Sequence, residues 1–151
     1  MHPKFAALAD SLHPSFVKLT ECVAHTGRVR LPIGVPNCGV YLFSEASNHL
    51  YVGRTDRLRY RHKEHWSGRA NDAPFAFKLA RHATNNLQKG GPTRKALEAD
   101  LIFAASFAEA KERVSNMQFR WVEEADANRQ CLLEMYATIV LDTRYNDFIN
   151  H

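Results

Sequence analysis

Three basic side chains recur at four-residue intervals along one segment of the chain: Arg57, Arg61 and His65. In a helix, this spacing places all three on one face. A guanidinium group can bind two phosphate oxygens at once, so Arg61 suits a phosphoryl group and the whole face suits successive phosphates. The alternative interpretation is a solvated basic helix face that binds no ligand.

A single acidic residue, Glu134, stands within the largely apolar stretch Cys131–Leu141. A helix that is apolar almost all round is usually buried, and a buried carboxylate without a partner is costly. We therefore expect a cation beside Glu134, either a metal ion or a basic side chain such as that of Arg61. The alternative is a glutamate at the edge of a buried face.

Two tyrosines, Tyr41 and Tyr51, lie in β-rich runs at residues 39–43 and 49–53. The turn-forming residues between the runs predict an antiparallel hairpin. Side-chain direction in a strand repeats every two residues, so both phenols can face the same side. Gly53 ends the second run, where a backbone without a side chain can approach a substrate closely, although a turn glycine is the ordinary explanation.

In this order, the residues resemble the GIY-YIG nuclease family. Gly39-Val40-Tyr41 is similar to the first tripeptide of the family and Tyr51-Val52-Gly53 to the second. The residues that follow at the family's arginine, histidine, glutamate and asparagine positions are Arg61, His65, Glu134 and Asn146. The resemblance spans Cys38–Phe148, and residues 118–123 look like the third strand of the family.

The resemblance implies a DNA endonuclease that hydrolyses phosphodiester bonds with one divalent metal ion, Mg²⁺ or Mn²⁺. Glu134 would be its protein ligand, and water and phosphate oxygen would fill the other positions, as suits a cation that loses water reluctantly. Arg61 would offset the negative charge that develops on the phosphate. The residues that contact or position the substrate would be Gly53, Arg54, Arg57 and Asn146.

By the same resemblance, a tyrosine would take the proton of the attacking water, with Tyr41 favoured slightly over Tyr51. His65 would orient this base or relay its proton. Tyrosine ordinarily has a pKa near ~10, so we expect positive charge from Arg61, His65 and the metal ion to lower it. The products would carry a 5′-phosphate and a 3′-hydroxyl.

Two other functions fit the same residues: an inactive or weakly active nucleic-acid-binding module of this fold, and an RNA nuclease. One site per chain cuts one strand, so a double-strand break needs a homodimer or two visits. Because the chain shows no separate DNA-reading motif, specificity is expected to come from loops, from the N-terminal helices or from a recruiting protein partner.

Hydrophobic periodicity predicts the elements that position these residues. Helices are expected at residues 3–24 with a break at His13-Pro14, then at 56–66, 75–83, 93–117 with an interruption near 104–106, and from an Asp126 cap to 141. Residues 118–123 alternate as a strand with one buried face. Residues 26–38 and 85–92 read as loops, and the tail at 143–151 as irregular.

Together these elements predict the fold class α+β, with a small three-stranded antiparallel sheet flanked by helices. We expect residues 1–36 to form an N-terminal helical extension that packs on the core. Residues 37–151 would form the GIY-YIG-like domain, so that the whole chain is a single globular domain.

Composition supports a folded domain and excludes several classes of protein. The 151 residues are 45% hydrophobic and 24% charged, unlike disordered or collagen-like chains. No apolar run approaches the ~20 residues of a membrane span, and the N-terminal stretch does not resemble a signal peptide. The three cysteines are far apart with no Cys-x-x-Cys motif, so neither a disulfide framework nor a cysteine zinc site is expected, and the cytoplasm is the expected compartment.

Charge is distributed unevenly along the chain. The formal net charge is +4, but residues 54–95 alone hold 11 Lys and Arg against 3 Asp and Glu. A one-sided cationic surface is typical of a protein that binds a polyanion, because neutralised phosphates release their condensed counterions. The sequence therefore predicts DNA as the partner rather than a membrane, although a solvated basic surface explains the charge equally well.

Overall fold

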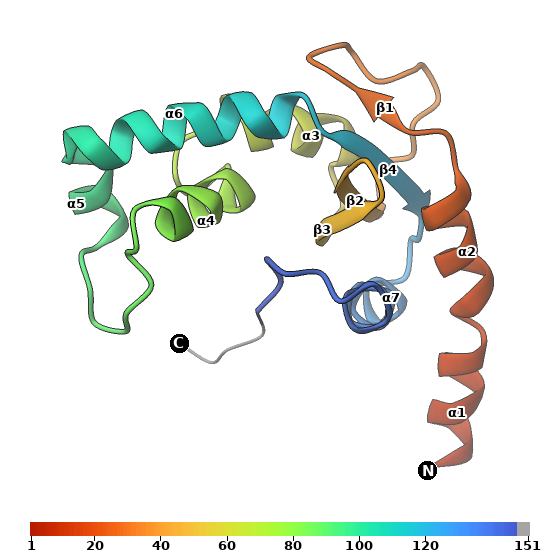
Figure 1. Cartoon of the computed structure of the whole chain (residues 1–151). Helices are drawn as coiled ribbons and strands as arrows, with labels where there is room; N and C mark the ends of the chain where they lie inside the picture. Colours follow the sequence, from red (N-terminus) through yellow and green to blue (C-terminus); the bar gives the residue numbers. More distant parts are fainter. Residues whose placement is uncertain (148–151) are drawn as a thin grey trace.

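The computed structural model describes residues 1–147, and the last four residues of the predicted irregular tail lie outside that range. Figure 1 shows a mixed α+β fold with one antiparallel sheet in the strand order β1-β4-β2-β3. The strands are β1 (His25–Thr26), β2 (Gly39–Glu45), β3 (Asn48–Thr55) and β4 (Gln118–Glu123). The helices are α1 (Pro3–Asp10), α2 (His13–Glu21), α3 (Leu58–Ser67), α4 (Pro74–Ala83), α5 (Arg94–Ala99), α6 (Leu101–Ser115) and α7 (Ala127–Leu141).

The predicted hairpin is confirmed as β2 paired with β3, and β4 is the predicted third strand. The sheet has a fourth strand that the sequence analysis missed, since β1 pairs with β4 through only two residues, His25 and Thr26. Two residues carry no alternation of polar and apolar side chains, so periodicity cannot detect such a strand. The α+β class is therefore as predicted, with four strands rather than three.

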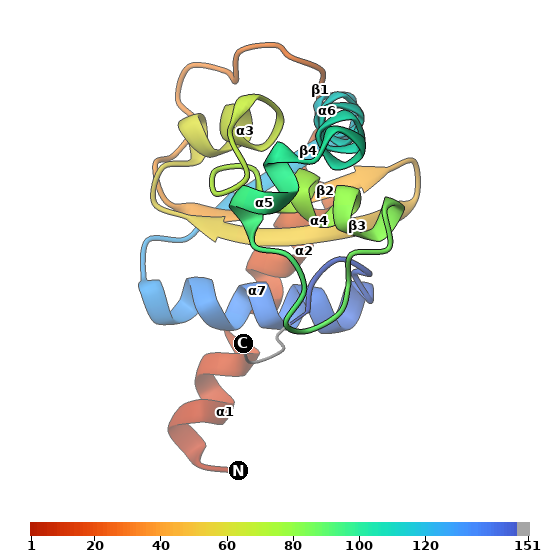
Figure 2. The same cartoon turned by 90° about the vertical axis from the view of Figure 1, so that its left-hand side faces the viewer.

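The two faces of the sheet bury separate apolar clusters, because neighbouring side chains point to opposite sides. Tyr41, Phe43 and Phe119 face the cluster that includes the inner residues of α3, α4 and α6. Val40, Leu42, Val52 and Val122 face the cluster formed with α2 and α7, through Leu19, Leu133 and others. Figure 2 shows α3 and α6 above the sheet and α7 below it.

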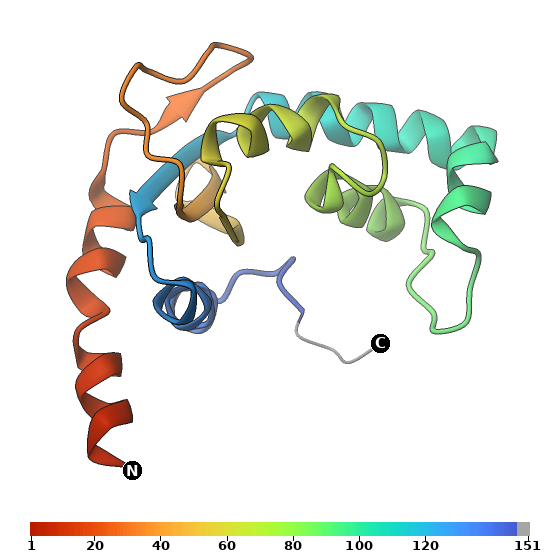
Figure 3. The same ribbon diagram turned by 180° about the vertical axis from the view of Figure 1, so that it is seen from behind.

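The predicted helices are present, with two breaks corrected. The first break falls at Ser11 and Leu12 rather than at His13-Pro14, because Pro14 suits the first turn of α2, which begins at His13. The long helix over 93–117 is broken at Asp100, not at 104–106, because the Asp100 side chain accepts a hydrogen bond from the N–H of Phe103 at 2.8 Å and starts α6. Asp126 caps α7 in the same way, as predicted, by accepting from the N–H of Arg129. Helix α1 has no buried residue and extends away from the body (Figure 3), whereas Leu19 of α2 is fully buried.

None of the helices within residues 1–147 has the length and apolar character needed to cross a bilayer. The division of the chain at residue 36 stays a prediction.

Candidate functional site

An open cleft of about 710 Å³ lies where β3 ends, between the start of α3 and the first half of α7. Its lining combines Cys38, Arg54, Thr55, Asp56, Arg57, Arg61, Ala125, Ala127, Gln130 and Glu134. Three guanidinium groups and two carboxylates therefore share one cavity, although they come from β3, from the β3–α3 connection, from α3 and from α7. Four of the residues predicted to form the site, Arg54, Arg57, Arg61 and Glu134, meet here.

The cation predicted beside Glu134 is Arg54, not Arg61. The Arg54 Nε donates to Oε2 of Glu134 at 3.0 Å. Burial raises the pKa of Glu134, and the neighbouring Arg54 offsets part of this effect. The apolar pattern of α7 correctly singled out Glu134. Its partner, Arg54, lies on β3, 80 residues away in sequence.

Behind the cleft, Arg61 links the surface to a buried pair of side chains. The Arg61 Nε donates to the Tyr41 hydroxyl at 3.3 Å, and the same hydroxyl lies 2.8 Å from Nε2 of His65. Tyr41 is 1% exposed and His65 is fully buried. Three of the five predicted catalytic residues, Tyr41, Arg61 and His65, thus form one hydrogen-bonded chain, of which only Arg61 lines the cleft.

The second predicted tyrosine, Tyr51, lies on the same face of the hairpin as Tyr41. The register pairs Tyr41 with Gly53 and Phe43 with Tyr51, and the centroids of the two phenol rings are 6.4 Å apart. The ring of Tyr51 also stacks on Phe75, with centroids 4.7 Å apart and nearly parallel planes. Both phenols therefore face one side, as the two-residue period of the strands predicts.

The expectation that a site tyrosine has a lowered pKa is wrong for this structure. Burial raises the pKa of Tyr41 to about 12, because the loss of water penalises the phenolate more than Arg61 stabilises it. Burial, and then the neighbouring Tyr41, raise the pKa of Tyr51 further. Both phenols are therefore protonated at neutral pH.

The basic stripe on α3 runs from the surface into the core instead of along the surface. The Arg57 side chain is 60% exposed and that of Arg61 18% exposed, whereas His65 is buried. Burial, and then the positive charge of Arg61, hold the pKa of His65 well below its usual value, so the ring is neutral. His65 therefore neither contacts successive phosphates nor supplies the positive charge that the sequence analysis expected of it.

Gly53 makes room for Tyr41 across the hairpin. A Cβ added at Gly53 would overlap the hydroxyl and ring carbons of Tyr41. Position 53 must therefore lack a side chain so that the Tyr41 phenol can lie over the strand and reach His65. Only the strand register, which pairs Tyr41 with Gly53, shows this reason for the glycine.

Asn146 binds the edge strand and does not line the cleft. Its side chain accepts from the N–H of Val52 and donates to the carbonyl of Val52, each at 2.8 Å. The hydroxyl of Thr143 also donates to its Oδ1 at 2.9 Å. These bonds fix β3 between Tyr51 and Gly53, so Asn146 holds the strand and does not contact a substrate in the cleft.

Glu64, which was not among the predicted site residues, binds two of the cleft arginines. Its carboxylate lies 3.2 Å from Nη2 of Arg57 and 3.2 Å from Nη1 of Arg61. The same Nη1 donates to the carbonyl of Asp72 at 2.8 Å, so the guanidinium of Arg61 is held from three sides. The signal was present in the sequence, because Glu64 follows Arg61 by three residues and Arg57 by seven on one helix.

Glu134 is the candidate ligand for a divalent metal ion. No group of three or more His, Cys, Asp and Glu side chains within residues 1–147 is arranged to hold a metal. Mg²⁺ needs only one or two carboxylates because water and phosphate oxygens complete its shell. A partly buried carboxylate whose partner is a half-exposed arginine fits this requirement.

Comparison of the chain with protein-family models, with curated proteins and with solved structures found no match in any of the three. The functional interpretation therefore depends on the residues of the cleft and of the chain of hydrogen bonds behind it.

Proposed function

We propose that the protein is a metal-dependent DNA endonuclease of the GIY-YIG type. The observation that carries this proposal is the cleft at the end of β3, where three arginines and one partly buried glutamate from distant segments meet. Cations at this spacing suit a phosphodiester, and the lone carboxylate suits a hard metal ion. The hydrogen-bonded chain of Arg61, Tyr41 and His65 supplies groups that can bind a phosphate and move a proton.

Substrate binding exchanges carboxylate partners for phosphate. Glu64 and Glu134 neutralise the arginines of the free protein, and a phosphate oxygen that displaces them forms charge-assisted bonds of the same kind. The Nη2 of Arg61 donates to no atom among residues 1–147, so it is available to the scissile phosphate. The bonds from Nε to Tyr41 and from Nη1 to the carbonyl of Asp72 hold the guanidinium in place when Glu64 is displaced. Arg61 thus stabilises charge on the phosphate without reorganising.

Glu134 would hold the divalent ion, which when bound stabilises the negative charge of the leaving oxygen. In this arrangement Arg54, released from Glu134, contacts a neighbouring phosphate. The raised pKa of Glu134 means that a cation must compensate its charge whenever it is ionised.

Proton transfer would run through Tyr41 without forming a free phenolate. Because burial raises the pKa of Tyr41 to about 12, its oxygen accepts a proton from water only as its own proton moves to Nε2 of His65, 2.8 Å away. His65 is neutral, so its Nε2 can accept that proton, but burial and the positive charge of Arg61 lower the pKa of the ring and make it return the proton rapidly. Tyr41 is favoured over Tyr51 because its hydroxyl contacts both Arg61 and His65.

Cleavage of supercoiled plasmid and of branched DNA, with and without Mg²⁺, tests the proposal. We expect wild-type protein to cut only with the metal ion and Arg61→Ala to lose most of this activity. Arg59→Ala is the matched control, since Arg59 is an exposed arginine on the same helix that does not line the cleft. Equal activity of wild type and Arg61→Ala contradicts the mechanism.

One observation favours a second candidate, a nucleic-acid-binding module with little or no activity. Tyr41 is 1% exposed and does not line the cleft, so water must pass Arg61 to reach it. A titration with Mg²⁺ separates the two functions. DNA binding with the salt dependence of phosphate contacts, but with no response to the metal ion and no cleavage, supports the binding module.

A further inference from the structure

A second basic cavity lies on the far side of α4 from the sheet, and the proposed cleavage site does not use it. It has a volume of about 580 Å³ and is enclosed by α4, by the connection between α4 and α5 and by α5. This loop is the green segment below α4 and α5 in Figure 1. We call the cavity the α4–α5 hollow, lined by Phe77, Lys78, Arg81, His82, Leu87, Gln88, Lys89, Gly90, Gly91, Pro92, Arg94, Leu97 and Asp147.

The hollow is more strongly cationic than the cleft. Four lysine and arginine side chains line it against one carboxylate, that of Asp147, which pairs with Lys78 at 2.7 Å. Burial, and then the positive charges of Arg144 and Lys78, lower the pKa of His82 beside it, while Asp147 acts in the opposite direction and does not cancel them. Among the lining residues within 1–147, no further carboxylate neutralises the remaining positive charge.

Two of the cations are already fixed in position. The guanidinium of Arg94 lies 4.8 Å from the centroid of the Phe77 ring and donates from Nη1 to the carbonyl of Ala70 at 2.8 Å. Arg81 donates from Nε to the carbonyl of Asn86 at 2.6 Å. Because these groups are held before any ligand arrives, binding an anion there costs little side-chain entropy.

The hollow also has apolar walls, which a site for phosphate alone does not need. Phe77, Leu87 and Leu97 lie among the cations, and Leu87 is 48% exposed. Cavities of roughly 300–1,000 Å³ with a mainly apolar lining and a few polar groups hold compact organic ligands, and a nucleotide belongs to that size class. Cations together with apolar or stacking surfaces are typical of sites for single-stranded nucleic acid.

We propose that the α4–α5 hollow binds a nucleotide of single-stranded DNA, with the phosphates on Lys78, Arg81 and Lys89 and the base against Leu87 and the plane of Arg94. A duplex must first unpair and unstack a base before it can enter a cavity, whereas a single strand can turn one nucleotide into it without that cost. The assignment to DNA rests on the proposed function. It implies that the preferred substrate has a single-stranded segment beside the bond that is cut.

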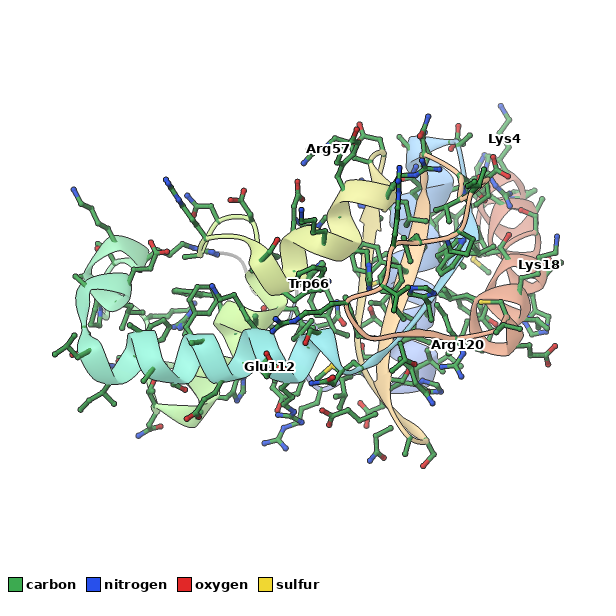
Figure 4. All side chains as sticks on the ribbon, turned by 90° about the horizontal axis from the view of Figure 1, so that it is seen from above. Lys4, Lys18, Arg57, Trp66, Glu112 and Arg120 are labelled. Carbon is green, nitrogen blue, oxygen red and sulfur yellow. The ribbon has the colours of Figure 1, made fainter. Side chains whose placement is uncertain are left out.

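Fluorescence anisotropy with a labelled oligothymidylate of about ten nucleotides tests the proposal, since this length spans a typical single-strand site. The measurement is made in EDTA, so that binding does not depend on cleavage. Lys89→Glu reverses a charge in an exposed loop, and Lys4→Glu is the matched control on α1, at the opposite end of the molecule from α5 (Figure 4).

We expect Lys89→Glu to weaken oligothymidylate binding about tenfold at low salt and to reduce the salt slope by about 0.7 for each phosphate that the variant no longer neutralises. Binding of a blunt duplex should fall much less, and Lys4→Glu should bind both as wild type does. Unchanged oligothymidylate affinity in Lys89→Glu overturns the proposal. An equal loss for duplex also overturns it and assigns the hollow to the duplex backbone.

The same experiment separates this inference from the proposed function. If wild-type protein cuts plasmid DNA with Mg²⁺ but Lys89→Glu binds the oligonucleotide normally, the single-strand site in the hollow is wrong and the proposed endonuclease function is supported. If no cleavage occurs but oligonucleotide binding depends on Lys89, the single-strand site in the hollow is supported and the proposed endonuclease function is wrong.

Discussion

At the scale of single residues, the central feature is a tyrosine hydroxyl shared by an arginine and a neutral histidine. Tyr41 contacts Arg61 and His65 in the interior, where burial raises its pKa to about 12. A group in this environment does not act as a free phenolate at neutral pH. It can accept a proton from water only as its own proton passes to His65, because Arg61 stays protonated. The contact with His65 distinguishes the role of Tyr41 from that of Tyr51.

The first prediction concerns Tyr41→Phe. Removing the hydroxyl breaks the proton path, so single-turnover cleavage should fall by about 10²–10⁴-fold while DNA affinity is retained. Tyr51→Phe should keep most of the activity. Because the pKa of His65 is already well below 6.5, the wild-type rate should not decline at the ordinary pKa of histidine. A larger loss in Tyr51→Phe than in Tyr41→Phe would assign the base to Tyr51.

The second prediction concerns Glu64, which neutralises Arg57 and Arg61 in the free protein. Glu64→Gln removes a negative charge beside the cleft and frees both arginines, so DNA affinity measured by anisotropy should increase about three- to tenfold at low salt. Glu109→Gln, an exposed change of equal charge on α6, is the control. Weaker binding in Glu64→Gln would mean that Glu64 orients the arginines for the substrate.

At the scale of elements, α3 carries cleft residues at its start and buried histidines further along. His62 and His65 pack against the sheet, and the His62 ring lies 4.6 Å from the centroid of Phe119. Neither ring lies in a group of three potential metal ligands among residues 1–147. The packing of α3 on the sheet therefore requires that both imidazoles be neutral. Because the start of α3 lines the cleft, protonation of these rings at low pH would also change the cleft.

The third prediction follows from His62. Burial, and then the charge of His25, lower the pKa of His62 from 6.5 to about 4. The unfolded chain binds the proton more tightly, so stability is highest above pH 6.5 and is lost as pH falls towards about 4. Urea denaturation across this range should give a loss of about 3 kcal/mol from this group. His62→Phe should flatten the slope, leaving the part that belongs to His65, and an unchanged slope would contradict the assignment.

Periodicity and capping chemistry predicted the hairpin, β4 and all the longer helices, because each has a run of residues with its own repeat. It also located Arg61 and Glu134. These sequence patterns did not predict that Arg54 pairs with Glu134, or that Gly53 leaves room for the ring of Tyr41. Both features depend on contacts between different segments of the chain. The burial that raises the pKa of Tyr41 is likewise a property of the packed core and not of its neighbours in sequence.

At the scale of the whole molecule, the basic segment at residues 54–95 divides between two cavities on different sides of the fold. Arg54, Arg57 and Arg61 line the cleft at the end of β3. The α4–α5 hollow is lined by Lys78, Arg81, Lys89 and Arg94. Acidic residues from later in the chain line both cavities, Glu134 the first and Asp147 the second. The charge asymmetry seen in the sequence is therefore a property of two sites rather than of one continuous surface.

The proposed endonuclease function depends on one claim, that the partly buried carboxylate of Glu134 binds the divalent metal ion. The decisive measurement is the single-turnover rate of Mg²⁺-dependent DNA cleavage by wild type and Glu134→Gln, with DNA affinity and thermal stability measured on the same samples. The raised pKa of Glu134 means that its ionised form costs folding energy at neutral pH, so the amide should leave stability equal or higher. We predict that Glu134→Gln, which frees Arg54, binds DNA at least as tightly as wild type does, remains folded and loses cleavage by at least about 10³-fold. Cleavage at the wild-type rate, or a loss of stability that accounts for the loss of rate, would contradict the proposed function.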